Sequence, residues 1–340
     1  MRIATYNVEW FNALFDRRDR PLADGEWSKR YNVTREQQLT AVAKVLTAMD
    51  ADAVMVIEAP DHSDRRSTVA ALEHFAAAFD LRTRAALIGF SNDTQQEIAL
   101  LYDPDVMTPR HDPIGAIFEP QAPRFDGVFR MDLDVDTDAE EVTFSKPPLE
   151  LSIETQSGTR LRMIGVHAKS KAPHGARTPE EVMRISIDNR RKQLAQCIWL
   201  RRRIVAHLDA GESVIVLGDF NDGPGLDEYE KLFGHSGVEI VLGLPEMDQS
   251  AMLFDPNARQ ALQTPLSATI STARFYNVET RSYLSALLDY IMVSPDLAAR
   301  GGQWRVWHPF DDPEIYAVPE LRQALLDASD HFPVTLDIAI

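Results

Sequence analysis

Residues 213–222, SVIVLGDFND, combine an apolar run with a polar ending, and the chain then turns in GPG (223–225). The apolar run predicts a buried strand, so Asp219 and Asn221 stand two apart where that strand ends. One interpretation is a local turn in which these side chains bond their own backbone. The other is that the carboxylate and the amide form part of an active site. The rest of the chain decides between them.

Other polar side chains share this placement, because each lies at the end of an apolar run where a loop should begin. They are Asn7, Glu58, His167, Asp289 and the pair Asp330–His331. Strand-end residues from separate strands can converge at one edge of a sheet, and loops there commonly carry function. The shared placement therefore predicts one polar site.

Each of these residues also has a purely structural interpretation. Asn7 can bond a local turn, Glu58 can mark a strand that leaves the core, and His167 can be a satisfied interior histidine. The pair Asp330–His331 can cap the entry to the last strand. Asp289 is harder to explain, because it interrupts the apolar LLDYIMVS (287–294). An unpaired buried carboxylate is costly, so Asp289 should have a partner.

The composition describes an ordinary globular protein with an unusual charge. The chain has 340 residues and a net charge of −17, much of it in MDLDVDTDAEE (131–141). Proteins that bind nucleic acid by neutralising its phosphates are usually basic. An acidic chain that acts on phosphates needs a local basic groove or a metal ion.

The single cysteine and the lack of long apolar runs bear on location. Cys197 excludes an internal disulfide and is expected to be a small buried hydrophobe. The N-terminus lacks the apolar region of a signal peptide, and no run approaches the ~18 apolar residues of a membrane span. We therefore expect a soluble cytoplasmic protein with no stable membrane association.

Periodicity and turn residues predict alternating strands and helices. TREQ (34–37) matches a capping box, with Thr34 and Gln37 as the reciprocal pair. The arginine-rich RRK (190–192) and RRR (201–203) are expected to form a solvated helix face. No linker is long enough to divide the chain, so a single domain over 1–340 is expected. Strands are expected at 2–8, 51–59, 84–89, 97–102, 149–155, 160–168, 213–219, 287–293 and 332–338, and helices at 34–49, 67–79, 180–208, 226–233 and 318–327. A long loop is expected at 12–33, and irregular connections with short strands at 104–147.

Six stretches in this order resemble the endonuclease/exonuclease/phosphatase superfamily, the metal-dependent phosphoesterases that include DNase I-like and exonuclease III-like enzymes. They are TYNVEWF (5–11), VIEAP (56–60), IGVHAKSK (164–171), LGDFND (217–222), LLDYIMVS (287–294) and SDHFPV (329–334). The resemblance covers essentially the whole chain. It implies an α/β fold, a four-layer α-β-β-α sandwich of two mixed β-sheets flanked by helices.

The resemblance also implies a metal site. Glu58 would be the main ligand of Mg²⁺ or Mn²⁺, with Asn7 and Asp330 close by. Hydrolysis of an anionic phosphodiester needs a hard cation, and Mg²⁺ accepts a few carboxylates together with water and substrate oxygens. One departure is Ile57, which stands beside Glu58 where the family usually has Gln.

Five further residues would carry the chemistry by the same resemblance. Asp219 would orient or deprotonate the attacking water, or help to hold a metal, and Asn221 would hold a phosphate oxygen or the nucleophile. His331 would contact the phosphate or act as general base, with Asp289 on its other ring nitrogen. His167 would stabilise the phosphate or protonate the leaving oxygen.

The substrate is less well defined than the reaction. Lys169 and Lys171 could hold flanking phosphates or only solubilise their loop. Tyr276 and Tyr283 could stack on bases, although core positions are the commoner case for aromatic residues in strands. The segment LSAL before Asp289 and the histidine at 167 depart from the abasic-site repair branch.

Three functions follow in order of preference, and the sequence indicates no protein partner. The first is a nuclease that hydrolyses phosphodiester bonds in DNA or RNA. The second is a phosphatase or phosphodiesterase acting on a small soluble phosphoester, which the charge of −17 favours. The third is an inactive binding module.

Overall fold

The computed structural model of the chain contains two large mixed β-sheets. It describes residues 1–119, 121–131, 140–173, 175–223, 234–263, 270–277 and 281–340. The helix expected at 226–233 and most of the acidic stretch 131–141 lie outside the described residues.

The first sheet has six strands in the order β14-β15-β1-β2-β4-β3. Its central pair, β1 and β2, is parallel, whereas β1 pairs antiparallel with β15 and β2 pairs antiparallel with β4. The strands are β1 (Arg2–Asn7), β2 (Ala53–Ala59), β3 (Ala85–Ile88), β4 (Glu97–Tyr102), β14 (Gln303–Val306) and β15 (Val334–Asp337).

The second sheet has five strands in the order β13-β10-β9-β8-β5. Here β10 runs parallel to β9 and antiparallel to β13. The strands are β5 (Met107–His111), β8 (Leu149–Thr155), β9 (Arg160–His167), β10 (Val214–Asp219) and β13 (Asp289–Val293). Two separate hairpins pair β6 (Phe129–Met131) with β7 (Glu140–Val142) and β11 (Ala273–Asn277) with β12 (Ser282–Ala286).

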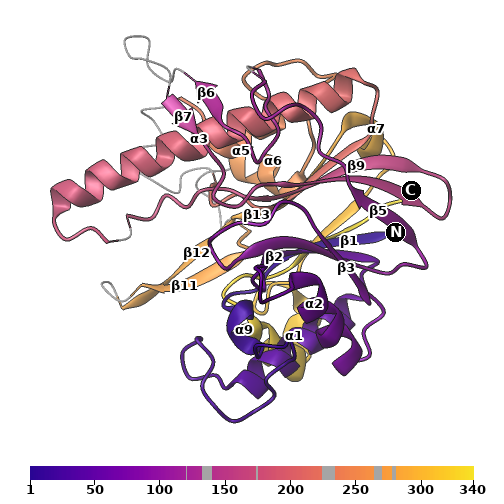
Figure 1. Cartoon of the computed structure of the whole chain (residues 1–340), viewed down its shortest axis with the longest axis vertical. Coiled ribbons are helices and arrows are strands. Elements are labelled where there is room, and N and C mark those ends of the chain that lie inside the picture. The colour runs from indigo at the N-terminus through magenta and orange to yellow at the C-terminus, as the bar shows by residue number, and fades with distance from the viewer. Residues whose placement is uncertain (120, 132–139, 174, 224–233, 264–269, 278–280) are drawn as a thin grey trace.

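Helices cover the outer face of each sheet (Figure 1). On the first sheet α1 (Arg35–Met49), α2 (Thr68–Ala78) and α9 (Pro319–Ala328) share one apolar cluster with β1, β2 and β4. On the second sheet α3 (Pro179–Asp209), α5 (Gly237–Leu242) and α6 (Pro256–Gln263) pack on β9 and β10. The shorter helices are η1 (Phe11–Leu14), α7 (Pro295–Ala298) and α8 (Pro313–Tyr316).

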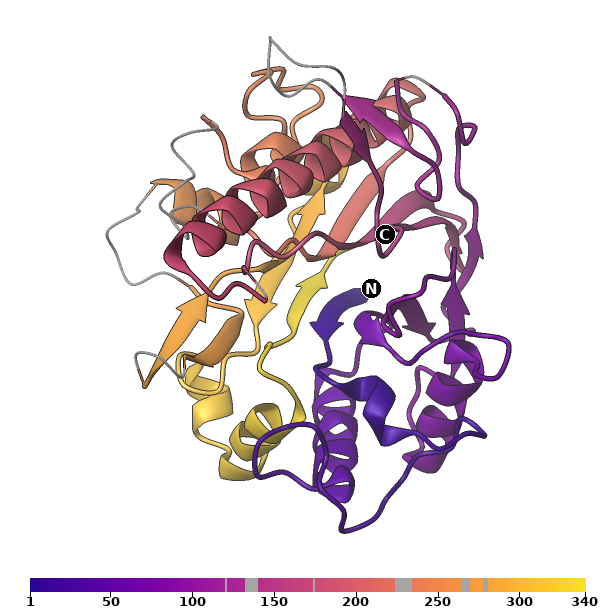
Figure 2. The same cartoon turned by 60° about the vertical axis from the view of Figure 1, so that its left-hand side comes forward.

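A third apolar cluster joins the inner faces of the two sheets, with Met55 and Leu100 on one side and Met163 and Ile215 on the other. Strands between two layers are covered on both faces and read as continuous apolar runs. The four-layer α-β-β-α sandwich expected from the sequence is therefore confirmed. The two termini lie side by side, and the amino group of Met1 donates to the carbonyl of Ile338 (Figure 2).

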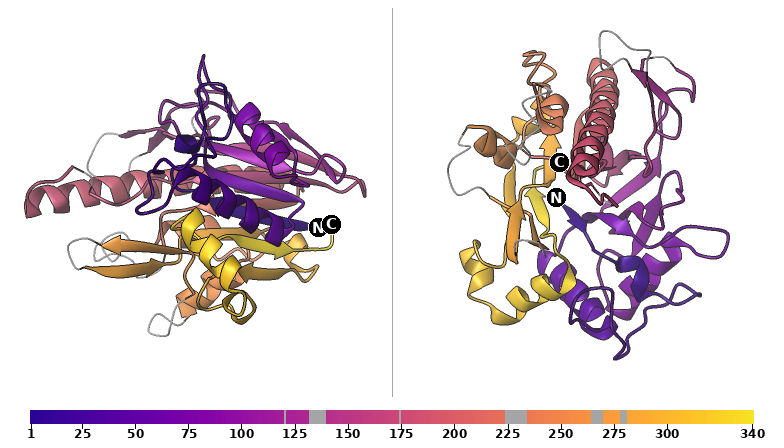
Figure 3. Two further views of the ribbon diagram at one scale, coloured as in Figure 1. Left: turned by 90° about the horizontal axis from the view of Figure 1, so that it is seen from below. Right: turned by 90° about the vertical axis from the view of Figure 1, so that its left-hand side faces the viewer.

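Several elements begin and end close to the residues predicted from local sequence patterns. The expected capping box opens α1, with both reciprocal bonds between Thr34 and Gln37 present. β8 and β9 pair as the expected hairpin. The expectation missed β14, α5, α6 and the β11–β12 hairpin, which projects beyond the sheets on the same side as the N-terminal part of α3 (Figure 3). None of the helices in the described part of the chain is long and apolar enough to cross a membrane.

The prediction of a solvated arginine face on α3 was wrong for three of its residues. Arg190, Arg201 and Arg203 are buried. Arg203 donates to the carbonyls of Ala122 and Pro123, because the connection before β6 crosses the helix. Arg201 pairs with Glu246, because a second loop covers that side of the helix.

The aromatic residues of the β11–β12 hairpin also differ from expectation. Tyr276 and Tyr283 pair across the hairpin and are 54% and 55% exposed, so they are not core residues. Their neighbours in the two strands, Phe275 and Leu284, line the cavity described below. Successive side chains of a strand point to opposite faces, and the two tyrosines therefore lie on the face away from that cavity.

Candidate active site

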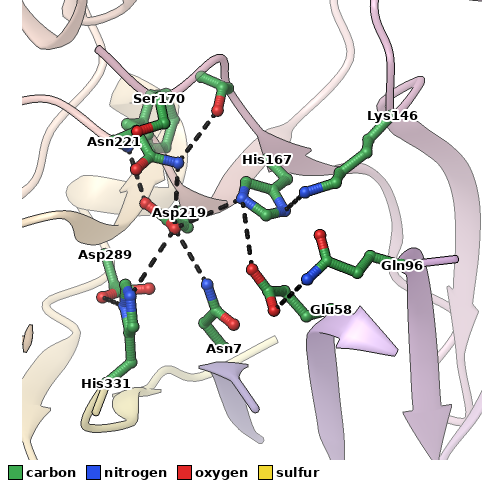
Figure 4. Close-up of polar contacts among 12 residues, drawn as sticks. Asn7, Glu58, Gln96, Lys146, His167, Ser170, Asp219, Asn221, Asp289 and His331 are labelled. Atoms are coloured by element: carbon green, nitrogen blue, oxygen red, sulfur yellow. Dashed lines mark hydrogen bonds and ion pairs between the residues drawn. The ribbon is translucent and has the colours of Figure 1, made fainter. Parts of the chain in front are cut away.

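Strand ends from both sheets meet at one edge of the sandwich, as expected from the sequence (Figure 4). The register of the second sheet aligns Asp219, the last residue of β10, with His167 of β9 and with Asp289 of β13. In the first sheet Asn7 ends β1 opposite Ile57, next to Glu58. These polar groups share an edge because β9 and β10 end there while the antiparallel β13 begins there.

A cavity of about 1050 Å³ opens at this edge. Among the described residues, Asp289 is the one predicted site residue that does not line it, because it lies behind His331. The predicted residues that line the cavity are Asn7, Glu58, His167, Lys169, Lys171, Asp219, Asn221, Asp330 and His331.

The carboxylate of Asp219 accepts hydrogen bonds from Asn7 and Asn221. Its Oδ2 accepts from Asn7 Nδ2 at 3.0 Å, and its Oδ1 accepts from the backbone N–H of Asn221 at 2.7 Å. The side chain of Asn221 reaches the same carboxylate at 3.3 Å. Burial raises the pKa of Asp219 above its usual range. A carboxylate held in this way is poised to orient a water molecule and to accept its proton.

His331 has the carboxylate of Asp289 on one ring nitrogen. Nδ1 lies 2.8 Å from Asp289 Oδ2, and Nε2 lies 4.0 Å from Asp219 Oδ2. Burial alone would lower the pKa of His331, but the charge and hydrogen bond of Asp289 raise it well above its usual value. Asp289 is 1% exposed, so His331 is the partner that its buried position requires. The imidazolium form of His331 is therefore favoured.

The Nδ1 atom of His167 faces a lysine, whereas the Nδ1 atom of His331 faces a carboxylate. Lys146 Nζ donates to His167 Nδ1 at 3.2 Å, since a lysine ammonium has no acceptor. The proton of the neutral ring then lies on Nε2, which faces Asp219 Oδ2 at 3.7 Å and Glu58 Oε1 at 4.0 Å. Burial lowers the pKa of His167 well below its usual value, and the charge of Lys146 lowers it further. His167 is thus a neutral hydrogen-bond donor.

The oxygen atoms around Glu58 suit a hard divalent cation. Glu58 and Asp330 line the cavity together with Asn7, whose Oδ1 is buried and has no hydrogen-bond partner among the described residues. Carboxylate and amide oxygens are the ligands that Mg²⁺ and Mn²⁺ prefer. Burial raises the pKa of Glu58, which a bound cation would offset. The residues present therefore fit the metal that the family resemblance implies.

A second group of possible ligands lies deeper. Atoms of Asp219, Asp289 and His331 all lie within 4.8 Å of one another. The hydrogen bond between Asp289 and His331 already occupies one atom of each. Around Glu58, by contrast, Asn7 Oδ1 has no hydrogen-bond partner among the described residues, so that group suits a cation better.

The two lysines predicted to bind substrate differ in their surroundings. Lys171 Nζ donates to Asp222 Oδ1 at 2.6 Å, and Asp222 also accepts from the backbone N–H of Gly237 at 2.6 Å. Lys171 thus braces the loop after β10. Lys169 lines the cavity, and burial lowers its pKa.

Sequence reasoning missed three residues of the site: Lys146, Gln96 and Ser329. Lys146 stands three residues before β8 and Gln96 directly before β4, so the rule that polar residues at strand ends converge applies to both. Ser329 Oγ donates to the carbonyl of Asn7 and accepts from the backbone N–H groups of Glu9 and His331. It ties the end of β1 to the loop that carries His331.

Comparisons with known proteins identify the family of the chain. The model of the Endonuclease/Exonuclease/phosphatase family matches residues 4–331. No curated protein matches the sequence.

Solved structures share the fold at low sequence identity. The 3'-5' exonuclease NExo from Neisseria meningitidis superposes with a TM-score of 0.52 at 17% identity, over 100% of both chains. A structure of the 3' phosphatase NExo from Neisseria bound to product DNA hairpin gives 0.51 at 18% identity, again over 100% of both chains. A mannosyl-6-phosphatase from Bacteroides thetaiotaomicron gives 0.50 at 14% identity over 100% of both chains. With the family model spanning nearly the whole sequence, the chain belongs to the endonuclease/exonuclease/phosphatase family of metal-dependent phosphoesterases.

Proposed function

We propose that the protein is a Mg²⁺- or Mn²⁺-dependent phosphodiesterase that hydrolyses nucleic acid at the cavity between the strand ends. The observation that carries the proposal is the grouping of a buried carboxylate with two imidazoles whose surroundings move their pKa values in opposite directions. Asp219 Oδ2 lies 3.7 Å from Nε2 of His167, whose pKa is lowered, and 4.0 Å from Nε2 of His331, whose pKa is raised. Environments that separate the pKa values of neighbouring groups mark acid and base roles.

The proposal assigns a role to each side chain that lines the centre of the site. Asp219, held by Asn7 and Asn221, orients the attacking water and takes its proton. His331 contacts a phosphate oxygen as a cation, with Asp289 holding its ring. His167 donates a hydrogen bond from Nε2 to the phosphate or the leaving oxygen.

Glu58, with Asn7 and Asp330, would hold the divalent cation. When bound, that cation neutralises charge on the phosphate. Lys146 and Lys169 add positive charge at the cavity wall, which supports a polyanionic substrate despite the net charge of −17. The DNA hairpin bound to the Neisseria relative supports the same substrate class.

A small soluble phosphoester is the second candidate substrate. The charge of −17 favours it, because a polyanion is repelled at long range. A mannosyl-6-phosphatase is among the structural neighbours, so the fold also occurs in a phosphatase. An inactive binding module is less consistent with a complete set of acids, amides and histidines.

One panel of substrates separates these functions. The purified protein is incubated with Mn²⁺ or Mg²⁺ and single-stranded DNA, double-stranded DNA, RNA or a series of small phosphoesters. We expect cleavage of nucleic acid, and His167→Ala, Asp219→Ala and His331→Ala should each lower turnover by ~10²-fold or more. Intact nucleic acid with turnover of a small ester would assign the second function. No hydrolysis of any substrate would indicate a binding module.

A further inference from the structure

The carboxylate of Glu58 has an amide partner directly before β4, the strand next to β2 in the same sheet. Gln96 Nε2 donates to Glu58 Oε2 at 2.5 Å (Figure 4). Gln96 directly precedes β4, whereas Glu58 lies near the end of β2, so the contact joins the two strands. The other oxygen, Oε1, lies 4.0 Å from His167 Nε2 at the catalytic cavity. One oxygen of Glu58 is therefore anchored while the other faces the site.

The backbone of Glu58 needs such an anchor. The pairing of β2 with β4 shifts register between Ile57 and Ala59, and Glu58 adopts a φ of +61° at this bulge. A residue other than glycine rarely adopts this conformation unless its surroundings hold it there. Bulges of this kind redirect a side chain out of the strand's alternation. Both neighbours of Glu58 are fully buried, while its own side chain reaches the cavity.

Neither neighbour of Glu58 in β2 has a side chain that could supply this amide. Ile57, directly before Glu58, packs in the core between the sheets and carries no donor on its side chain. Beside the bulge, Ala59 is in register with Glu97, so Gln96 is the residue next to the partner of Ala59, and its side chain reaches the carboxylate of Glu58.

The segment around Gln96 is itself held in place. Asn92 Nδ2 donates to the carbonyl of Gln96 at 3.0 Å and to Glu97 Oε2 at 2.8 Å. The backbone N–H of Thr94 donates a hydrogen bond to Asn92 Oδ1 at 2.8 Å. Glu97 is 1% exposed. The turn before β4 therefore presents the Gln96 amide at a defined position.

We propose that Gln96 is a positioning residue for the divalent cation, acting by fixing the carboxylate of Glu58. The inference rests on the proposed role of Glu58 as the main metal ligand. A hydrogen bond to Oε2 orients the carboxylate so that Oε1 is free to bind the cation. Removing such a supporting partner typically lowers metal affinity by about 10–100-fold.

The test measures metal binding directly, without substrate. Mn²⁺ is titrated calorimetrically into the full-length wild type, Gln96→Met and Gln95→Asn. Methionine preserves the length of the side chain but removes the donor. Gln95 is a matched control, because it is the adjacent glutamine, is exposed, and adopts a φ of +62° that asparagine tolerates. We expect Gln96→Met to weaken Mn²⁺ binding by about 10–100-fold and Gln95→Asn to bind as the wild type does.

Turnover supplies a second readout. Because only the metal ligand is misplaced, excess Mn²⁺ should return the kcat of Gln96→Met towards that of the wild type. Binding by Gln96→Met within twofold of the wild type would overturn the inference. An equal loss in Gln95→Asn would also overturn it, because the effect would then belong to the turn. Glu58→Gln separates the two proposals: unchanged Mn²⁺ binding in this variant would remove the metal assignment at Glu58.

Discussion

Gly218 offers the sharpest test of how the fold positions the site. It stands directly before Asp219 in β10, in register with Val166 of the parallel strand β9. Its φ is +140°, and a Cβ added there would lie 2.0 Å from the carbonyl oxygen of Val166. Val166 directly precedes His167. A side chain at position 218 therefore pushes apart the two strands that carry Asp219 and His167.

The expected effect of Gly218→Ala follows from this geometry. The contact involves backbone on both sides, so no side chain can rotate away. Overpacking typically costs about 1–3 kcal/mol, and a strained backbone conformation adds about 1–3 kcal/mol. We expect the free energy of unfolding to fall by about 2–6 kcal/mol. A shift of about 1 Å between catalytic groups can lower turnover by ~10²-fold.

Gly165→Ala is the matched control in the neighbouring strand. A Cβ at Gly165 would meet the side chain of Met55, 2.4 Å from its sulfur. Methionine is flexible and can adjust. Urea unfolding and hydrolysis of bis(p-nitrophenyl) phosphate with Mn²⁺ are compared for both variants. Gly218→Ala should lose more stability and far more turnover. Equal losses, or a Gly218→Ala protein with wild-type stability and turnover, would refute the reasoning.

Three further predictions concern the supporting residues. Ser329→Ala removes the hydroxyl that bonds the backbone of Asn7, Glu9 and His331. Because two backbone N–H groups lose their acceptor, the free energy of unfolding should fall by about 1–3 kcal/mol. A denaturant titration measures this, and an unchanged midpoint would contradict it. Asp289→Asn removes the charge that raises the pKa of His331, and burial then lowers that pKa, so the alkaline limb of the kcat/KM profile should move to lower pH. An alkaline limb that stays in place would exclude His331 as the cation. Lys146→Met should lower kcat/KM by ~10-fold or more, and Lys146→Arg should retain most of it, because arginine keeps the donor and the charge facing His167. Equal activity of both variants and the wild type would show that Lys146 has no part in the reaction.

The family, the sandwich and most of the polar set could be predicted because their signals are local. The capping box at Thr34 and Gln37 needs only four residues, and its bonds form as expected. The runs before Asp219 and Asp289 identify buried strands by composition alone. A polar residue at the end of such a run is visible without knowing its neighbours in space.

The errors share a physical cause, which is that burial depends on what covers an element. Arg201 and Arg203 lie on a long helix whose own pattern allows solvent exposure. Loops around residues 122–123 and 246 cover them and accept their hydrogen bonds. Conversely, Tyr276 and Tyr283 pair on a hairpin outside the two main sheets, so their strand pattern did not imply a core position.

The sequence by itself determined which chemistry the site can offer: carboxylates, amides and imidazoles at strand ends. Tertiary structure decided how those groups are tuned. Burial lowers the pKa of both His167 and His331, but Lys146 lowers the pKa of His167 further, whereas Asp289 raises that of His331 well above its usual value. Gln96 reaches Glu58 across 38 positions, and Ser329 reaches Asn7 across 322. Such partners are set by the pairing and stacking of strands distant in the chain, because hydrogen bonds and charges act through space.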